Sequence, residues 1–257
     1  MSDIHVGRRA DELDGEAWLA RSLDDLTANV RDIQYGLTLG DITHHGDRDS
    51  LMRYLNLRDK SRIPKWFQVA GNHEHRNGGI VHYRQLVGEA SPFVFTEGNI
   101  AWFFLSDEQK RAPGNISTRS LRWLRSNLNR HRDKIIILCS HQIPPNTTGR
   151  SSEDLFCLHP RDRIRDIFGE FPIALSLFGH EHHAPYSRKQ MTQKNGTMYI
   201  NAASMNHAYG TQMSASLILE LEENKREIVV RRRDHDRQRF QDEFEIKIPL
   251  PKPIRLS

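Results

Sequence analysis

Two kinds of apolar pattern alternate along the first two-thirds of the chain. Short apolar runs without helical spacing predict strands at Tyr35–Leu39 and 66–70, and buried inner strands at 134–140 and Ile173–Phe178. Between these runs, apolar residues recur at spacings of three and four, as in amphipathic helices. Helices are therefore expected at 11–33, at 49–59, after a cap at Ser117, and at 159–168. This alternation favours an α/β fold.

Strand patterns dominate the last third of the chain. Segments 197–200, 214–221, 227–233 and 243–248 alternate between apolar and polar residues, and we expect mostly antiparallel strands there. Earlier, 93–96 and 101–106 are expected to pair through a turn at Gly98 and Asn99. No repeat, low-complexity tract or linker divides the chain. We therefore predict a single domain over residues 1–257, in which 205–257 add C-terminal strands to the second sheet of a core formed by 1–204.

Polar residues with metal-ligand chemistry follow the ends of several extended segments. They are Asp3 and His5, Asp41, Asn72 with His73, His141, and His180 with His182. In an α/β sheet the carboxyl ends of parallel strands line one crevice, so these side chains are expected to meet. His180 and His182 are two positions apart, and on an extended backbone their rings would point the same way.

The mixture of carboxylate, amide and imidazole groups limits the kind of ion that could bind. It suits Mn, Fe, Zn or a related first-row metal better than Cu(I) or an iron–sulfur cluster. Without His73, seven candidate ligands are left, which is too many for one tetrahedral site. The number suits two ions that share a bridging carboxylate. All three metals accept these ligands, so the sequence does not select among them.

Composition limits which substrates and which cellular compartment are expected. A formal net charge of +4 and a pI near 9.1 suit anionic substrates without implying nucleic acid. The two cysteines, Cys139 and Cys157, make no disulfide framework. The chain has no apolar run of about 18 residues that could span a membrane and no pattern of a secretion signal. We therefore expect a cytoplasmic protein with no membrane partner. No pattern indicates an oligomeric state.

Five short blocks resemble those of the calcineurin-like metallophosphoesterase family, and they occur in the family's order. The blocks are Asp3-x-His5, Gly40-Asp41-x4-Gly46, Gly71-Asn72-His73-Glu74, Ser140-His141 and Gly179-His180-x-His182. With the later segment 199–204, the resemblance covers roughly residues 1–204. It implies an α/β fold built as a four-layer α/β/β/α sandwich of two mixed sheets flanked by helices. It also implies a centre of two metal ions.

The resemblance assigns roles to individual residues. One ion would be bound by Asp3, His5 and His182, the other by Asn72, His141 and His180, with Asp41 bridging both. His73 resembles a family histidine that lies beside the substrate phosphate without binding metal. Asn72 and His73 are therefore expected to contact substrate. His207 is a further candidate lining the substrate cleft.

The expected reaction is hydrolysis of a phosphate ester. Two ions a few ångströms apart can clamp phosphoryl oxygens and lower the pKa of a shared water, so that hydroxide attacks phosphorus. His73 is the candidate proton donor to the leaving oxygen. Protein phosphatases of the superfamily carry Asp and Arg after the bridging aspartate, where this chain has His44 and His45. Fewer fixed cations favour phosphodiesters, whose monoanions need less positive charge.

Three functions stay in consideration. The first is hydrolysis of small phosphodiesters, with phosphomonoesters as the nearest variant. The second is a nuclease-like phosphodiesterase, which would need a basic groove; Arg231-Arg232-Arg233 is better explained as a solvated edge strand. The third is a non-catalytic metal-binding scaffold, which would have no use for His73.

Two segments near the predicted site raise separate expectations. The family has an apolar strand before its Asp-x-His block, whereas Asp3 and His5 follow only Met1 and Ser2. Either the given sequence starts after that strand, or the sheet lacks the strand and Asp3 and His5 lie on a terminus that is liable to fray. Residues 142–154, rich in proline and small polar residues, are expected to form a mobile loop in the cleft wall.

Overall fold

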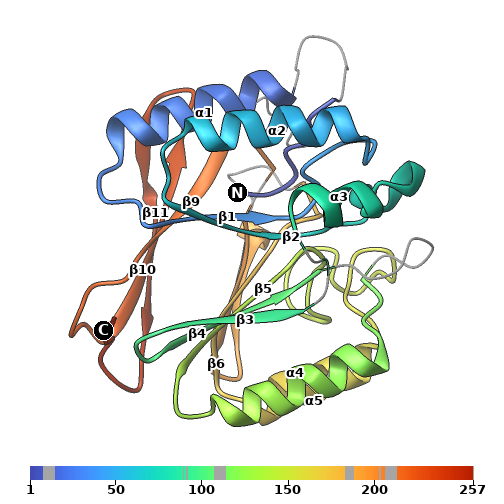
Figure 1. Cartoon of the computed structure of the whole chain (residues 1–257). Helices are drawn as coiled ribbons and strands as arrows, with labels where there is room; N and C mark the ends of the chain where they lie inside the picture. The colour runs from blue at the N-terminus through green and yellow to red at the C-terminus, as the bar shows by residue number, and fades with distance from the viewer. Residues whose placement is uncertain are drawn as a thin grey trace.

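The structure, a computed structural model, describes residues 1–7, 15–88, 90, 92–106, 114–182, 188–202, 204–205 and 213–256. Sheets lie in the middle of the molecule, with helices on two opposite sides (Figure 1). This is the mixed α/β class expected from the sequence. His207 lies outside the described residues, and the single-domain reading stays a prediction.

A six-stranded mixed sheet is the largest element of the fold. Its strands, in spatial order, are β3 (Phe93–Glu97), β4 (Ile100–Leu105), β5 (Ile135–Ser140), β6 (Ile173–Phe178), β8 (Thr197–Asn201) and β7 (Met191–Lys194). Strands β4, β5, β6 and β8 are parallel, and the outer strands β3 and β7 pair antiparallel with their neighbours. The carboxyl ends of β5 and β6 therefore lie side by side, directly before His141 and Gly179.

Two smaller sheets stand where one second mixed sheet was expected. One is a parallel pair of β1 (Tyr35–Leu39) and β2 (Lys65–Val69). The other is antiparallel, with β10 (Glu227–Asp234) between β9 (Ala215–Glu220) and β11 (Arg239–Pro249). Side chains of both, including Leu39, Val69 and Val230, share a hydrophobic core with one face of the six-stranded sheet. The smaller sheets therefore pack on the same face of the larger one.

Helices cover the outer sides of these sheets (Figure 1). α4 (Thr118–Arg130) and α5 (Arg161–Glu170) share a core with the second face of the six-stranded sheet. α1 (Gly15–Asn29), α2 (Arg48–Lys60) and α3 (Ile80–Leu86) contribute to a third core with the N-terminal segment. Ser117 caps α4 as predicted, accepting from the Ser120 amide. None of the helices in the described ranges combines the length and apolar character needed to cross a membrane.

Strand β4 shows why inner strands of this sheet are continuous apolar runs. Ile100, Trp102 and Phe104 enter the core shared with the smaller sheets. The alternate residues Ala101, Phe103 and Leu105 enter the core shared with α4 and α5. Both faces of the strand are buried, so no polar position interrupts it. The prediction of buried strands from such runs is confirmed.

The prediction of a solvated edge strand at 231–233 is wrong. β10 is the central strand of its sheet, and the side chains of Arg232 and Arg233 are 3% and 4% exposed. A register shift between Arg231 and Arg233 interrupts the alternation that the prediction assumed. Arg233 instead donates two hydrogen bonds to the buried carboxylate of Asp25 on α1.

Some short elements were not predicted. They are α3, the edge strand β7, and two 3-10 segments, η1 (His73–Gly78) and η2 (Arg188–Gln190). β7 carries mostly exposed polar residues, so it lacks the apolar signal of an inner strand. η1 follows Asn72 directly and turns the chain away from the end of β2.

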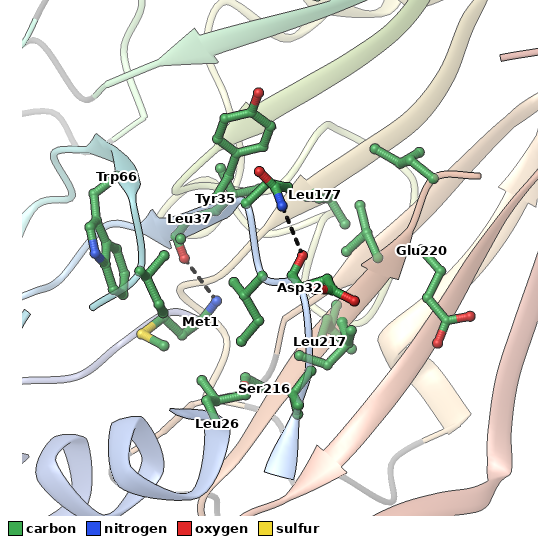
Figure 2. A pocket seen from close by; sticks show the side chains of 18 of the residues that line it. Met1, Leu26, Asp32, Tyr35, Leu37, Trp66, Leu177, Ser216, Leu217 and Glu220 are labelled. Atoms are coloured by element: carbon green, nitrogen blue, oxygen red, sulfur yellow. Dashed lines mark hydrogen bonds between the residues drawn. The ribbon is translucent and has the colours of Figure 1, made fainter. Parts of the chain in front are cut away.

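A cavity of about 850 Å³ lies between β1 and β9. Figure 2 shows Tyr35 and Leu37 on one side of it and Leu217 and Glu220 on the other. The Met1 amino group donates to the Leu37 carbonyl at 3.0 Å along its edge (Figure 2). None of the candidate metal ligands lines this cavity. It is therefore separate from the predicted site.

Candidate metal centre

The candidate ligands follow the carboxyl ends of strands from two different sheets. Asp41 comes after β1, Asn72 after β2, His141 after β5, and His180 with His182 after β6. The strands bring these turns to one place, as the sheet-edge argument predicts.

Asp3 and His5 reach the same place on a buried segment that runs beside the end of β1. The Asp3 amide donates to the Gly40 carbonyl at 3.1 Å, and the His5 amide donates to the Asp41 carbonyl at 3.0 Å. Asp3 is fully buried and His5 is 1% exposed. Backbone hydrogen bonds and burial therefore hold this segment beside the end of β1.

The side chains form two groups that share one carboxylate. The first group is Asp3, His5, Asp41 and His182; the second is Asp41, His141 and His180. Within each group, one ligand atom from every residue lies within 4.8 Å of the others. The Asp41 Oδ2 atom is 3.2 Å from His141 Nε2 and 3.9 Å from His5 Nε2. One carboxylate oxygen thus faces both groups.

Asn72 lies beside the second group. Its side-chain oxygen lies 3.1 Å from His141 Nε2 and accepts from Gln142 Nε2 at 3.4 Å. The structure therefore brings together all seven predicted ligand residues. Their roles as ligands stay a prediction.

The local donor arrangement fits a metal ion. Asp3 Oδ1 is buried and accepts no hydrogen bond, although His182 Nε2 is 3.2 Å away. The His5 and His182 Nε2 atoms face each other at 3.0 Å. Each can accept or donate, but a shared cation would satisfy both rings and the Asp3 oxygen at once. The mixture of oxygen and imidazole donors suits a first-row divalent ion.

At neutral pH, burial and nearby charges keep most of these groups in the protonation state that binds a metal ion. Burial alone would raise the pKa of Asp41, but His141 and other rings hold this pKa well below its usual range. Asp3 follows the same pattern, with His182 lowering its pKa. Burial lowers the pKa of His180 to about 4. The pKa of His182 is raised, because Asp3 outweighs the effect of burial. His182 is therefore the ring among these that most needs a metal ion to displace its proton.

Ring orientation is set by backbone carbonyl groups. His141 Nδ1 lies 2.8 Å from the Leu39 carbonyl, and His180 Nε2 lies 3.0 Å from the Leu155 carbonyl. A carbonyl oxygen only accepts, so these nitrogens carry the protons. His141 is left with Nε2 as its lone-pair atom and His180 with Nδ1, and such partners commonly fix the tautomer of metal-binding histidines.

The ligand backbones are not extended, which corrects the geometric reason given for the His180 and His182 pair. The φ angles of the ligand residues are left-handed at Asp3 (53°), His5 (54°), Asp41 (50°), His180 (70°) and His182 (48°). Such conformations are unfavourable for residues other than glycine and cluster at functional sites. The two rings consequently enter different groups instead of pointing the same way.

Glycines precede several ligands because other residues approach their backbones closely. A Cβ at Gly71 would lie 2.4 Å from Asp41 Oδ1. A Cβ at Gly179 would lie 1.8 Å from Ser2 Oγ and 2.7 Å from Asp3 Oδ2. The Gly-Asn and Gly-His blocks therefore have a packing reason that a motif alone does not reveal.

Glu74 supports the candidate centre without being a ligand, and the block Gly71-Asn72-His73-Glu74 alone does not reveal this role. Its carboxylate accepts from the amides of Asp41 at 2.9 Å, Thr43 at 3.0 Å and Gly71 at 2.8 Å. It thereby ties the turn after β1 to the turn after β2. Burial, together with the nearby Asp41 charge, raises the pKa of Glu74 to about 7.

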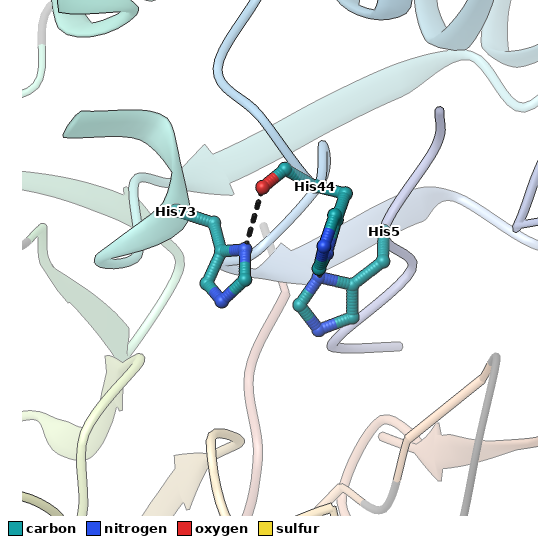
Figure 3. A group of neighbouring side chains, drawn as sticks. All are labelled: His5, His44 and His73. Carbon is teal, nitrogen blue, oxygen red and sulfur yellow. Dashed lines mark hydrogen bonds between the residues drawn. The ribbon is translucent and has the colours of Figure 1, made fainter. Parts of the chain in front are cut away.

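His73 lies next to His5 of the first group (Figure 3). Its Nδ1 donates to the His44 carbonyl at 2.8 Å, and its Nε2 is 3.8 Å from Asp41 Oδ2. His44 packs beside both His73 and His5, with its ring centroid 5.0 Å from that of His73 and 5.4 Å from that of His5, and the His5 and His73 centroids are 4.5 Å apart. The three rings form a cluster beside the shared carboxylate. The predicted substrate residues Asn72 and His73 thus flank the ligands, whereas His207 is outside the described residues.

Comparison with known proteins places this geometry in a family. A family model described as calcineurin-like phosphoesterase matches residues 1–184. The chain belongs to the calcineurin-like phosphoesterase family. The family match covers every candidate ligand of the two groups, from Asp3 to His182.

One relative is similar to this calcineurin-like chain in sequence, and two solved structures are similar to it in fold. It is 26% identical over 175 residues to a probable glycerophosphodiester phosphodiesterase GpdQ of Arcobacter nitrofigilis, covering 65% of this chain and 62% of that protein. Purple acid phosphatase PPD1 from yellow lupin (Lupinus luteus) seeds gives a TM-score of 0.69 at 10% identity over 97% of this chain and 52% of that chain. PhoD gives a TM-score of 0.51 at 11% identity, with coverage of 92% and 69%. Both structural matches show the fold alone. The chain thus spans less than two-thirds of GpdQ and about half of the lupin phosphatase.

Proposed function

We propose that this protein hydrolyses phosphate esters with two bound metal ions, and that small phosphodiesters are its substrates. The observation that carries the proposal is Asp41 Oδ2, which faces two groups of imidazole and carboxylate donors at once. A bridging carboxylate between two ions is the arrangement that paired-metal hydrolysis needs.

The residues divide between the two proposed ions as the family resemblance implies. Asp3, His5 and His182 would hold one ion, Asn72, His141 and His180 the other, and Asp41 both. When bound, such ions would polarise the phosphoryl group and supply a nucleophile from water at neutral pH. The donor set suits Mn, Fe or Zn.

The proposed role of His73 is to move a proton at Nε2. Because Nδ1 donates to the His44 carbonyl, Nε2 is the accepting atom of the neutral ring. Burial lowers the pKa of His73, so the ring is neutral in the free site. A phosphate anion beside Nε2 would raise that pKa. His73 could then carry a proton to the leaving oxygen.

We infer the preference for diesters over monoesters from the residues that follow Asp41. Where the family's protein phosphatases carry Asp and Arg, this chain has His44 and His45. Without that guanidinium, the site has one fixed cation fewer to offer a dianionic monoester. A monoanionic diester needs less positive charge. The match to a probable phosphodiesterase supports the same choice.

The test compares an aryl phosphodiester with the matching aryl phosphomonoester after reconstitution with Mn, Fe or Zn. We expect faster turnover of the diester. His73→Ala should keep its metal and lose turnover by roughly 10² to 10⁴, whereas Asp41→Asn should lose metal. His131→Ala, at a histidine that follows α4 and belongs to none of the ligand groups, is the matched control and should keep full activity.

Each alternative gives a different result in this assay. Full activity of His73→Ala on both esters would refute the role given to that residue. Faster turnover of the monoester would identify a phosphomonoesterase. Hydrolysis of DNA or RNA with a steep salt dependence would identify a nuclease. A metal-loaded protein that cleaves none of these would be a scaffold.

A further inference from the structure

Residues 142–160 form a loop, named the strap here, that crosses beside the candidate centre. The Ile143 amide donates to the Phe156 carbonyl at 3.1 Å, and the Leu158 amide donates to the Ile143 carbonyl at 2.8 Å. The His159 amide donates to the Gly114 carbonyl at 2.9 Å. These bonds fix the backbone of the second half of the strap. Its side chains there are consequently presented in defined positions.

A cluster with metal-ligand chemistry lies in this part of the strap. Cys157 Sγ is 3.6 Å from His159 Nε2, and His159 Nε2 is 3.9 Å from Asp154 Oδ1. All three atoms lie within 4.8 Å of one another. The cluster shares no residue with the two groups around Asp41. It is therefore separate from the two ligand groups of the candidate centre.

The spacing of the atoms fits tetrahedral coordination. With bonds of about 2.3 Å to sulfur and about 2.0 Å to imidazole, a tetrahedral ion places the two ligand atoms about 3.5 Å apart. The observed 3.6 Å between Cys157 and His159 agrees with this. Asp154 has to approach slightly, and its side chain is 81% exposed. The exposed side leaves the fourth position to water.

We propose that Asp154, Cys157 and His159 form a third metal site, which takes a thiophilic divalent ion such as Zn²⁺. Thiolate, imidazole and carboxylate are the ligands that Zn²⁺ accepts in proteins.

Binding changes two hydrogen-bonding arrangements in the cluster. His159 Nε2 lies 2.9 Å from the Asp154 carbonyl and carries a proton there, so ligation moves that proton to Nδ1 or to solvent. Arg161 Nη2 lies 2.8 Å from Asp154 Oδ1 and can stay on one carboxylate oxygen while the other binds the ion. Burial raises the pKa of the Cys157 thiol, so binding also releases the thiol proton.

The position of the site gives the ion a structural role. Leu155, between Asp154 and Cys157, presents the carbonyl that accepts from His180 Nε2. An ion held by residues on either side of Leu155 would fix that carbonyl. The third site would thus support a ligand of the candidate centre without belonging to it.

Co²⁺ is the probe for this site, because thiolate–Co²⁺ bonds give near-ultraviolet charge-transfer absorption. The groups around Asp41 contain no cysteine, so this band reports the third site alone. The full chain loaded with Co²⁺ should show the band, and Cys157→Ser should lose it together with one bound ion. Cys139→Ser, at the other buried cysteine, is the control and should keep both. Asp41→Asn should keep the band even where it loses other ions.

Asp154→Asn changes an exposed residue, so its effect is separate from unfolding and provides a second test. Loss of even an outer partner of a metal ligand weakens affinity by about 10-fold to 100-fold, so loss of the Asp154 carboxylate should weaken Co²⁺ binding at least tenfold, as followed by the band. A wild-type protein without the band, a band that persists in Cys157→Ser, or unchanged affinity in Asp154→Asn would each overturn the proposal. None of these results depends on whether the protein hydrolyses phosphate esters.

Discussion

The buried ion pair between Asp25 and Arg233 should be a major contributor to stability. Asp25 accepts from Arg233 Nε at 2.9 Å and Nη2 at 2.7 Å, from His235 Nδ1 at 2.7 Å and from Asn29 Nδ2 at 2.9 Å. Asp25 is 1% exposed. This network joins α1 to the central strand of the antiparallel sheet. Its loss should therefore affect two elements at once.

Asp25→Asn keeps the shape of the side chain but leaves the Arg233 cation buried without its counter-charge. Breaking a buried pair in this way costs about 3–5 kcal/mol. For a chain of this size each kcal/mol shifts the thermal midpoint by about 2–4 °C, so the midpoint should fall by roughly 6–20 °C. Urea unfolding measures the free energy and a thermal scan the midpoint. Asp24→Asn, at the exposed neighbouring position, is the matched control and should change stability by about 0.5 kcal/mol or less.

The same pair predicts how stability depends on pH. Burial alone would raise the pKa of Asp25, but hydrogen bonds from Arg233 and His235 lower it below the value of the unfolded chain. The stability from this group is therefore present above the unfolded pKa and is lost as pH falls through the folded one. That acid-side loss should be smaller in Asp25→Asn. A cost below about 1 kcal/mol for Asp25→Asn, or an equal cost for Asp24→Asn, would refute the reasoning.

Three further predictions concern the packing of the glycines, the core and the metal centre. Gly179→Ala should lose metal, measured as ions per chain, because its Cβ would meet Ser2 Oγ at 1.8 Å; Gly169→Ala, with nothing within 4 Å, should keep metal, and equal metal content in both would contradict the packing argument. Leu124→Ala should lower the free energy of unfolding by about 2–5 kcal/mol, whereas Met52→Ala, at a side chain that is 46% exposed, should cost about 0.5 kcal/mol or less. Chelation should lower the thermal midpoint and added Mn²⁺ should restore it; a midpoint that does not respond to either would argue against metal in the folded protein.

The sequence predicted those elements whose side chains carry the signal of burial. Runs such as Ile173–Phe178 are apolar because both faces of an inner strand are covered. Ser117 marked a helix start because a hydroxyl there satisfies a free amide. β7 was missed because an exposed edge strand needs no apolar residues. The division of the second sheet depends on which distant strands pair, and no local pattern encodes that choice.

At the candidate site, the sequence predicted the ligand residues, but it did not predict the backbone conformations and hydrogen bonds that hold them in place. Aspartate, asparagine and histidine after strand ends were sufficient to nominate the cluster, because sheet topology brings such ends together. The left-handed backbone at His180 and His182 depends on the turn around them. The Leu155 carbonyl that orients His180 comes from a loop whose path follows no periodic pattern. The burial of Arg232 followed from a register shift that alternation could not foresee.

The candidate ligands come from distant parts of the chain. The ring nitrogens of His5 and His182 face each other although the residues are 177 positions apart. Contacts that close such long loops are slow to form, and these two require the strand ends to be in place first. Interactions that form after the folding transition state slow unfolding and leave the folding rate nearly unchanged. Metal loading should therefore lengthen the lifetime of the native state and have little effect on how fast the chain refolds.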